Sequence, residues 1–416
     1  MGRRNDRHGM HHGDEKMQNA AATATWRKQM PRLTSSYLSH DLVTEILSWL
    51  PVKSLLRFRS VCKAWRGTIS GDPSFALAHH RRRSQRQPPS LLILTIPGDD
   101  DMDYYEDEEE NYVSKKKTTN PIKGRRCPFY RWSPRAAGEE STASLVYAVD
   151  TLPEPEHCRA PHDVLAHCDG LVLVPARREA RLLNTAARQV VTLPWSPGGD
   201  APHQAYGLGR ESYTYKAARF FYRTVYVVAT RGRDIIPEME VITIGVDAHW
   251  RETAAQPPYP VIPGRTATFL QDEGSGYLLW TVDERYLSPG ASAPGYLRFS
   301  LKDETFHVTP APPCHPRLDY AKSSLTELSG ELCVARMRDK HVLELWMSKS
   351  AVHPRWEQRH AIHVTCPGPE HPRPVAMFDD GIVFHEMASR VITATVLSAA
   401  TISEPGSGRI SSSSTE

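Results

Sequence analysis

The sequence lacks the features of a secreted or membrane protein. Its seven cysteines are an odd number without regular spacing, unlike the disulfide framework of a secreted domain. No stretch approaches the roughly 20 apolar residues that span a bilayer. No apolar segment follows the first residues as in a secretory signal, and there is no Asn-x-Ser/Thr glycosylation site. We therefore expect a protein of the nucleus or cytosol that makes no membrane contact.

The sequence also lacks a strong net charge and a catalytic motif. Its 51 Lys and Arg nearly cancel 48 Asp and Glu, which argues against nucleic acid as a partner. There is no P-loop and no Gly-x-Ser-x-Gly elbow. Cys158, His162, His167 and Cys168 are zinc-ligand types, but neighbours on a strand point to opposite faces. We expect no metal and no other cofactor.

What is present begins with a helical stretch over residues 38–70. Leu42, Ile46 and Leu50 fall on one helical stripe, with Val43 and Leu47 on a neighbouring stripe. The sequence predicts that the first helix ends at Pro51. It predicts a second helix from about Ser54 to Ile69, stopped by Gly71 and Pro73.

From about residue 145 to residue 397, short apolar runs alternate with turn residues, a pattern typical of an all-β domain. The 33 prolines and 25 glycines fit this pattern. A weak repeat begins at Gly170, Gly276, Gly330 and Gly381, with intervals of 106, 54 and 51 residues. A period near 50 favours kelch-like propeller blades, and predicts a further copy near residue 223.

One segment has a specific family pattern. Residues 50–58 read Leu-Pro-Val-Lys-Ser-Leu-Leu-Arg-Phe, and residues 61–66 read Val-Cys-Lys-Ala-Trp-Arg. Together they resemble the F-box in the form common in plants. The family usually has proline where Ser39 stands, and we expect Ser39 to cap the helix instead. More loosely, residues 167–173, 183–194 and 325–333 resemble the F-box-associated domain of plant proteins.

The resemblance implies a non-catalytic subunit of an SCF-type (Skp–cullin–F-box) E3 ubiquitin ligase. The F-box would bind a Skp-type adaptor, and through it a cullin–RING ligase, while the β domain would bind an unknown protein substrate. The residues expected to bind the adaptor are Leu38, Leu42, Ile46, Leu47, Leu50, Pro51, Val52, Leu55, Leu56, Phe58, Val61, Cys62 and Trp65.

A physical argument supports this expectation. A three-helix unit this short buries too little surface to cover all its apolar side chains, so some must face a partner. Three alternatives stay open: a helical subdomain that only packs on the β domain, a propeller that binds or hydrolyses carbohydrate, and an F-box scaffold without ubiquitin transfer.

The predicted organisation is α+β by content, with a small three-helix F-box followed by an all-β, propeller-like domain. The predicted parts are a disordered arm (1–35), the F-box (36–75), a linker and first strand (76–97), a charged disordered insertion (98–127), the F-box-associated β domain (128–398) and a disordered Ser-rich tail (399–416).

Overall fold

The computed structural model describes residues 38–86, 91–94, 127–132, 144–149, 165–175, 180–199, 201, 203–227, 232–287, 290–363, 373–378, 381–386 and 393–398. The predicted arm and tail lie outside the described residues, as does the charged insertion apart from residue 127. The chain divides into two compact units, Met1–Leu50 and Pro51–Glu416, and each is described by itself.

Among the described residues, four helices precede the first strand, whereas the sequence predicted a three-helix F-box. They are α2 (His40–Ser48), α3 (Val52–Phe58), α4 (Lys63–Gly71) and α5 (Pro73–Arg86). The second predicted helix is broken in two between Phe58 and Lys63. Cys62 adopts an extended conformation there, and its Sγ accepts a hydrogen bond from the Trp65 amide at 3.4 Å. A new N-cap therefore interrupts an apolar pattern that looks continuous in the sequence.

Helix α5 occupies the beginning of the segment 76–97, which the sequence predicts as a linker and first strand. Pro73, expected to stop a helix, is instead the first residue of one, where its missing N–H costs nothing. Asp72 caps this helix, because its Oδ1 accepts from the amides of Ser74 at 2.9 Å and Phe75 at 3.3 Å. Residues 73–86 thus extend the helical region past the predicted F-box boundary.

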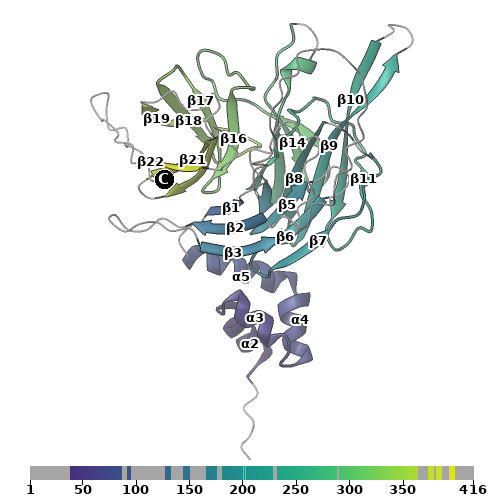
Figure 1. Cartoon of the computed structure of the whole chain (residues 1–416), viewed down its shortest axis with the longest axis vertical. Helices are drawn as coiled ribbons and strands as arrows, with labels where there is room; N and C mark the ends of the chain where they lie inside the picture. The colour runs from purple at the N-terminus through teal and green to yellow at the C-terminus, as the bar shows by residue number, and fades with distance from the viewer. Residues whose placement is uncertain are drawn as a thin grey trace, which may run out of the picture. The chain divides into compact units, whose positions relative to one another are not determined.

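The rest of the described chain is all β and forms six antiparallel sheets (Figure 1). Two sheets have three strands and four have four, each in chain order. The first two are β1 (Leu91–Leu94), β2 (Cys127–Trp132), β3 (Ser144–Val149), and β4 (Ala166–Cys168), β5 (Leu171–Pro175), β6 (Ala180–Asn184), β7 (Gln189–Thr192). The next two are β8 (Gln204–Glu211), β9 (Thr214–Val227), β10 (Gly232–Thr243), β11 (Arg251–Glu252), and β12 (Thr268–Asp272), β13 (Ser275–Thr281), β14 (Tyr296–Ser300), β15 (Phe306–Thr309). The last two are β16 (Ser323–Leu328), β17 (Glu331–Met337), β18 (Val342–Ser348), β19 (Glu357–His363), and β20 (Arg373–Phe378), β21 (Gly381–Glu386), β22 (Thr393–Ser398).

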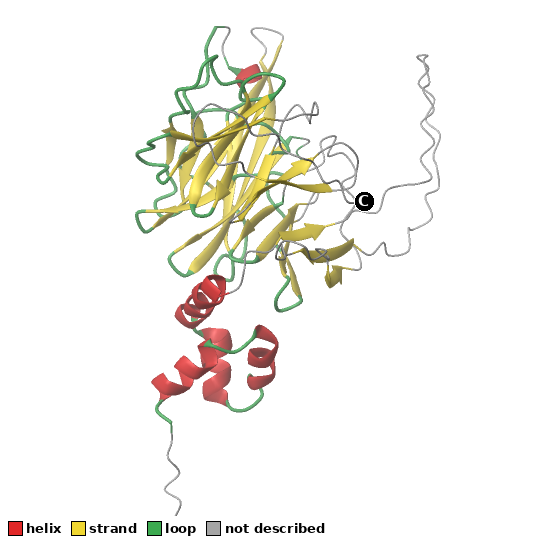
Figure 2. Cartoon of the chain, turned by 90° about the vertical axis from the view of Figure 1, so that its left-hand side faces the viewer, coloured by secondary structure: helices red, strands yellow, loops and turns green. Residues whose placement is uncertain are grey.

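The first strands of successive sheets contact one another, from β4 to β8, β8 to β12, β12 to β16 and β16 to β20. Consecutive four-stranded meanders joined in this way are the repeating unit of propeller-like folds. The sequence therefore predicted the class of this region correctly. Figure 2 shows the yellow strands joined by green loops, with the short 3₁₀ helix η1 (Glu284–Tyr286) among the loops at their upper end.

The repeat has a different register from the one predicted. The turns between first and second strands place Asp169–Gly170, Glu273–Gly274 and Ser329–Gly330 at positive φ, as type I′ turns require. The glycine equivalent to Gly170 is thus Gly274, and Gly276 lies within β13. The copy expected near residue 223 was misplaced, because the corresponding turn is at Ser212, which takes positive φ without glycine.

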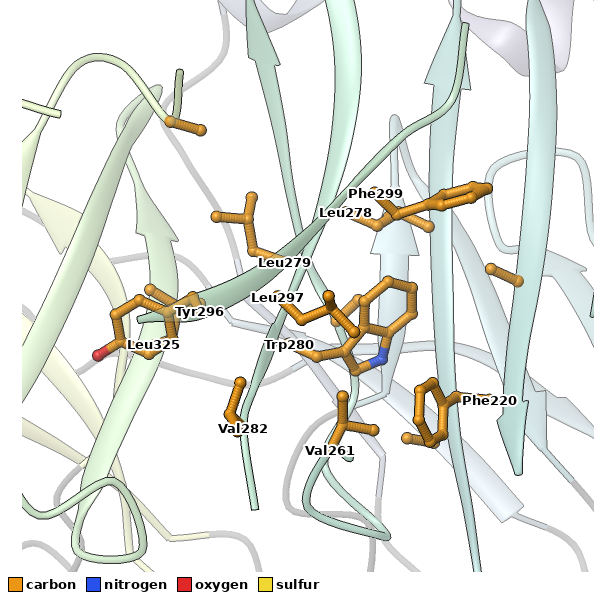
Figure 3. Close-up of a cluster of buried hydrophobic side chains, with 14 of the residues drawn as sticks. Phe220, Val261, Leu278, Leu279, Trp280, Val282, Tyr296, Leu297, Phe299 and Leu325 are labelled. Atoms are coloured by element: carbon orange, nitrogen blue, oxygen red, sulfur yellow. The ribbon is translucent and has the colours of Figure 1, made fainter. Parts of the chain in front are cut away.

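The largest apolar core lies around the β12–β15 sheet (Figure 3). Trp280, Tyr296 and Phe299 are at most 1% exposed there. The neighbouring strand β8 approaches this core closely: a Cβ on Gly207 would lie 2.9 Å from Leu278 Cδ1. Glycine is required there because the β8–β11 sheet packs directly on the β12–β15 sheet.

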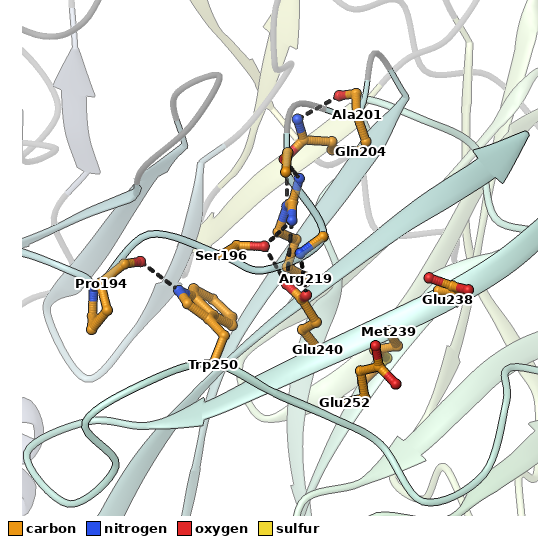
Figure 4. A network of polar contacts seen from close by, with 12 residues as sticks. Pro194, Ser196, Ala201, Gln204, Arg219, Glu238, Met239, Glu240, Trp250 and Glu252 are labelled. Atoms are coloured by element: carbon orange, nitrogen blue, oxygen red, sulfur yellow. Dashed lines mark hydrogen bonds and ion pairs between the residues drawn. The ribbon is translucent and has the colours of Figure 1, made fainter.

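A buried ion pair ties the β7–β8 connection to the second four-stranded sheet (Figure 4). Arg219 on β9 and Glu240 on β10 are cross-strand partners, and Arg219 Nη1 lies 3.2 Å from Glu240 Oε2. Arg219 Nη2 donates to the Gly199 carbonyl at 2.6 Å, and the Gly198 amide donates to Glu240 Oε1 at 2.7 Å. Ser196 Oγ hydrogen-bonds both side chains. The pair therefore fixes the loop as well as the sheet.

The fourth four-stranded sheet repeats this arrangement. Arg336 on β17 faces Glu344 on β18, with Nε 3.1 Å from Oε2. Its Nη1 and Nη2 donate to the carbonyls of Pro316 at 2.5 Å and His315 at 2.9 Å. In the second and the fourth four-stranded sheets, one buried Arg–Glu pair thus holds the connection that leads into the sheet.

Candidate functional site

Helix α2 begins at a side-chain cap. Ser39 Oγ accepts from the Leu42 amide at 3.3 Å, which confirms the expected capping role of this residue. Asp41 lies in the first turn, where a negative charge stabilises the helix dipole. The helix ends at Ser48, whose Oγ donates back to the Glu45 carbonyl at 2.6 Å. These local interactions fix which side chains share a face.

One face of α2 is apolar and exposed. Leu42 is 54% exposed and Ile46 50%, and Leu38 and Trp49 are exposed to a similar extent. At 100° per residue Leu42, Ile46 and the C-cap Trp49 fall within one arc of α2, and Leu38 directly precedes the N-cap Ser39. We call Leu38, Leu42, Ile46 and Trp49 the α2 stripe. A contiguous set of large apolar side chains open to solvent is typical of a protein interaction site.

The buried face of α2 carries Leu47, which is 1% exposed. The sequence predicts that Leu47 contacts the adaptor along with Leu42 and Ile46, and this stays a prediction; in this structure the Leu47 side chain is buried. Leu50 is half-buried. Leu47 is thus buried whereas Leu42 and Ile46 are exposed, although all three side chains are aliphatic.

In the segment 51–65, Leu55 is buried and supports α3 from within. Phe58 and Trp65 pack edge to face with ring centroids 5.5 Å apart, which joins the end of α3 to α4. Pro51, Val61 and Cys62 are exposed, and Val52, Leu56, Phe58 and Trp65 are half-buried. The exposed and half-buried residues stay available to a partner, whereas Leu55 does not.

Trp49 was not among the predicted adaptor contacts. Its Nε1 donates to Glu45 Oε1 at 3.1 Å, which holds the indole on the helix surface. Helical spacing from Leu38 and Leu42 places position 49 on the same face, so the signal was present in the sequence.

The family comparison matches this helical region. Residues 35–76 match the model of the F-box domain. This segment is an F-box domain. A putative F-box protein of Arabidopsis thaliana is 50% identical over 44 residues, covering 11% of this chain and 12% of the relative. A probable F-box protein of the same plant is 62% identical over 32 residues, covering 8% and 12%. This chain therefore matches about one-eighth of the length of each relative.

Solved structures are similar to the chain at low sequence identity. YjhT aligns over 66% of this chain and 89% of its own, at 10% identity and a TM-score of 0.36. An Aleuria aurantia lectin mutant aligns over 69% and 92%, at 9% identity and a TM-score of 0.35. A GH43 endo-arabinanase from Bacillus licheniformis aligns over 59% and 97%, at 9% identity and a TM-score of 0.29. No functional argument rests on similarities this low.

The described part of the β region contains no group of three or more His, Cys, Asp or Glu side chains that could hold a metal ion. His167 and Cys168 are adjacent on β4, and only Cys168 is buried. Burial raises the pKa of the Cys168 thiol well above its usual range, which keeps it protonated and unreactive. Within the residues that the structure describes, no helix is long and apolar enough to cross a membrane.

Proposed function

We propose that this chain is the substrate-recognition subunit of an SCF-type ubiquitin ligase. The F-box would bind a Skp-type adaptor that joins a cullin–RING ligase, and the β-sheet region would hold the target protein. F-box domains generally have this adaptor role, and F-box proteins are usually non-catalytic. The observation that carries the proposal is the α2 stripe, an apolar surface inside the segment that matches the F-box.

The stripe can contribute a measurable part of the binding energy of an adaptor contact. Burying the exposed half of a leucine or isoleucine side chain contributes about 1 kcal/mol. Four such side chains give about 4 kcal/mol before the entropic cost of association, or roughly three powers of ten in Kd. The half-buried side chains of α3 and α4 would add to this energy.

The adaptor contact is tested by titrating the purified full chain with a Skp-type adaptor in isothermal calorimetry. The double substitution Leu42→Ala/Ile46→Ala should raise the Kd about 30-fold, because it removes about 2 kcal/mol of buried surface. Leu145→Ala is the matched control, since Leu145 on β3 is 61% exposed, and it should leave the Kd unchanged. Equal binding by the double variant and the wild type would refute the proposed contact.

A third variant separates contact from folding. Leu47→Ala should lower the free energy of unfolding by about 2–5 kcal/mol because it leaves a cavity at a buried site. In contrast, Leu42→Ala/Ile46→Ala should leave the melting temperature nearly unchanged. If the double variant lost binding only together with its helical circular dichroism signal, the effect would come from unfolding.

Ubiquitin transfer distinguishes a ligase subunit from a scaffold. Proteins captured by the wild type in the nucleus or cytosol, where we propose it acts, would be tested in a ligase reconstituted with adaptor, cullin and RING subunits. A ligase subunit should ubiquitinate a captured target with the wild type and not with Leu42→Ala/Ile46→Ala. A target that both proteins bind and neither ubiquitinates would instead indicate a scaffold.

We also propose that the six sheets close into a propeller, which would bring β1 and β20, the first strands of the two three-stranded sheets, near each other. The chain-order meanders and the contacts between successive first strands support this arrangement. Spin labels at Leu91 on β1 and Arg373 on β20 would report it by electron–electron resonance. A closed ring predicts one narrow, short distance distribution, and an open arc predicts a long one.

A further inference from the structure

The loops of the sheets are unequal at their two ends. In an antiparallel meander, the loop between second and third strands shares an end with the connection to the next sheet. The third four-stranded sheet has a long loop at this end, residues 282–295, and its connection onward is residues 310–322. The corresponding loop of the next sheet is only residues 338–341. Long loops at one end of a rigid scaffold are typical binding elements.

The loop 282–295 contains an exposed arginine, Arg285, whose guanidinium is paired with the buried carboxylate of Asp283. Asp283, whose side chain is 3% exposed, accepts from Arg285 Nε at 2.9 Å and Nη2 at 2.7 Å. It also accepts from the Arg285 amide at 3.1 Å, which begins η1. The Arg285 side chain is nevertheless 71% exposed. Two of its five N–H donors are used, so the remaining three point away from the carboxylate.

Arg317 in the connection 310–322 is arranged in a similar way. Its Nη2 lies 3.3 Å from Glu284 Oε1 and 3.2 Å from the Ala293 carbonyl. Among the described residues its Nε and Nη1 donate to no acceptor, and the side chain is 59% exposed. Arg285 lies within η1 and Arg317 contacts Glu284 of the same helix, and each guanidinium is fixed through some of its donors. A guanidinium fixed beforehand loses less entropy when it binds an anion.

A cavity lies beside Arg317. Its volume is about 370 Å³, and its walls come from the two loops just described. The lining is mostly apolar: Ala293, Pro294, Pro310, Ala311, Pro312, Pro313, Cys314, His315, Arg317, Leu318 and Tyr320. This volume is at the lower end of the range for ligand sites and is enough for one or two apolar side chains.

The cavity wall is rigid. The carbonyls of His315 and Pro316 accept from Arg336, whose own charge is balanced by Glu344. At the other end of the loop, Arg265 Nη1 donates to the Tyr320 carbonyl at 3.0 Å. Prolines further restrict the backbone. The site therefore exists before any partner arrives, which reduces the cost of binding.

From this geometry we propose that Arg285, Arg317 and the adjoining cavity bind an extended segment of the target protein that carries an anionic side chain beside an apolar one. The apolar side chain enters the cavity, and a carboxylate or phosphate accepts the free N–H donors of the arginines. This inference rests on the proposed function of the β-sheet region in holding a target. It specifies the chemistry of the target segment.

The alternative is that both arginines only brace η1. Bracing and binding make different predictions, because bracing affects the stability of the loop whatever ligand is present. Arg251 provides the matched control. It is 44% exposed and is also paired with carboxylates, Asp247 and Glu304, but it belongs to the opposite loop end of the sheets.

The test begins with a random peptide library displayed on phage and selected on the immobilised full chain. Selected sequences are synthesised in three forms: with the acidic residue, with its uncharged amide, and with phosphoserine in its place. Binding is followed by fluorescence anisotropy at low and high salt. We expect selected peptides to share an acidic residue next to an apolar one. The amide form should bind about tenfold more weakly, since a charged hydrogen bond is lost. The phosphoserine arm distinguishes the two anion sources.

The variants decide between binding and bracing. Arg285→Gln and Arg317→Gln should each weaken binding of the acidic peptide about tenfold and leave binding of the amide form unchanged. Arg285→Lys, which keeps the charge without the fork, should lose part of the affinity and controls for folding. Arg251→Gln should have no effect. Selection of no peptide, selection of peptides without an acidic residue, or equal losses for both peptide forms would each overturn the proposal.

The adaptor contact does not enter this experiment. The Leu42→Ala/Ile46→Ala variant should bind the peptides as the wild type does. A failure of peptide binding therefore contradicts this site alone, and a failure of adaptor binding contradicts the proposed ligase role alone.

Discussion

The buried pair formed by Arg219 and Glu240 gives a quantitative test of how the second four-stranded sheet is held (Figure 4). Their side chains are 2% and 1% exposed, so neither charge is solvated by water. Glu240→Ala leaves a buried guanidinium without its carboxylate. Breaking a buried pair on one side costs about 3–5 kcal/mol, because the remaining charge loses both its partner and its solvent. We expect the free energy of unfolding to fall by this amount.

The double substitution Arg219→Met/Glu240→Leu should lower the free energy of unfolding much less than the sum of the losses caused by Arg219→Met alone and by Glu240→Leu alone. Replacing both charges removes the desolvation penalty along with the attraction, and methionine fills most of the arginine's volume. The loss of the Gly199 and Ser196 hydrogen bonds should keep the double variant somewhat below the wild type. The predicted coupling energy is therefore at least about 2 kcal/mol.

The assay is urea unfolding followed by tryptophan fluorescence. Trp250 is a suitable reporter because its Nε1 donates to the Pro194 carbonyl at 2.8 Å, next to the loop that the pair holds. Arg223→Met is the control: Arg223 pairs with Glu238 on the same two strands but is 55% exposed, so its loss should cost under about 1 kcal/mol. Additivity of the two single substitutions within about 0.5 kcal/mol would refute the reasoning.

Three further predictions concern single side chains. The guanidinium of Arg251 holds the pKa of Glu304 at about 2, below its ordinary 4.5, so its stabilisation is complete above pH 4.5 and is lost as the pH falls toward 2. Glu304→Gln should therefore cost about 1–2 kcal/mol at neutral pH, after allowance for solvent screening, and the difference from wild type in urea unfolding should vanish in acid; a pH-independent difference would contradict this. Gly209→Val should lower the melting temperature strongly, because a Cβ would lie 2.6 Å from Leu301 Cδ1; an unchanged melting curve would show that the sheets can separate at no cost. Ser39→Ala should reduce the stability of α2 by about 0.5–2 kcal/mol, measured by hydrogen exchange of its first turn, and unchanged exchange would mean that the cap contributes nothing.

The sequence predicted the local features of the F-box segment well. The first helix, which ends at Ser48 shortly before Pro51, and the cap at Ser39 both follow from interactions within a few residues. Helical spacing also grouped Leu42 with Ile46. It could not show that Leu47, of the same residue type, is buried while Leu42 is exposed, because burial depends on packing rather than on periodicity.

The β region shows the same limit at longer range. Strand texture identified the fold class, but the pairing of Arg219 with Glu240 joins residues on different strands, and its bond to Gly199 closes a loop between sheets. The blade turn at Ser212 was missed because the search relied on glycine at positive φ, and serine occupies that conformation here. The cavity beside Arg317 comes from two loops that are separated in sequence by β14 and β15.

The repeats explain why the proposed recognition site lies where it does. The second and fourth four-stranded sheets share the Arg–Glu brace, and each also has a tryptophan that donates to a proline carbonyl: Trp250 to Pro194 and Trp356 to Pro310, both at 2.8 Å. In the sheet between them, the position opposite Leu279 holds Arg298, and the described residues place no carboxylate across from it.

This middle sheet also carries the long loop 282–295 with η1. Its neighbours keep the shared bracing, so they supply the stability that a longer and chemically distinct loop requires. Arg336 in the following sheet shows how a neighbour supports the variable loops. It belongs to the repeated Arg–Glu brace, and it also holds the cavity wall at His315 and Pro316. Regularity on both sides therefore permits variation in the middle, and residues that differ from the repeat, such as Arg285 and Arg317, are where specificity for a target can arise without loss of the fold.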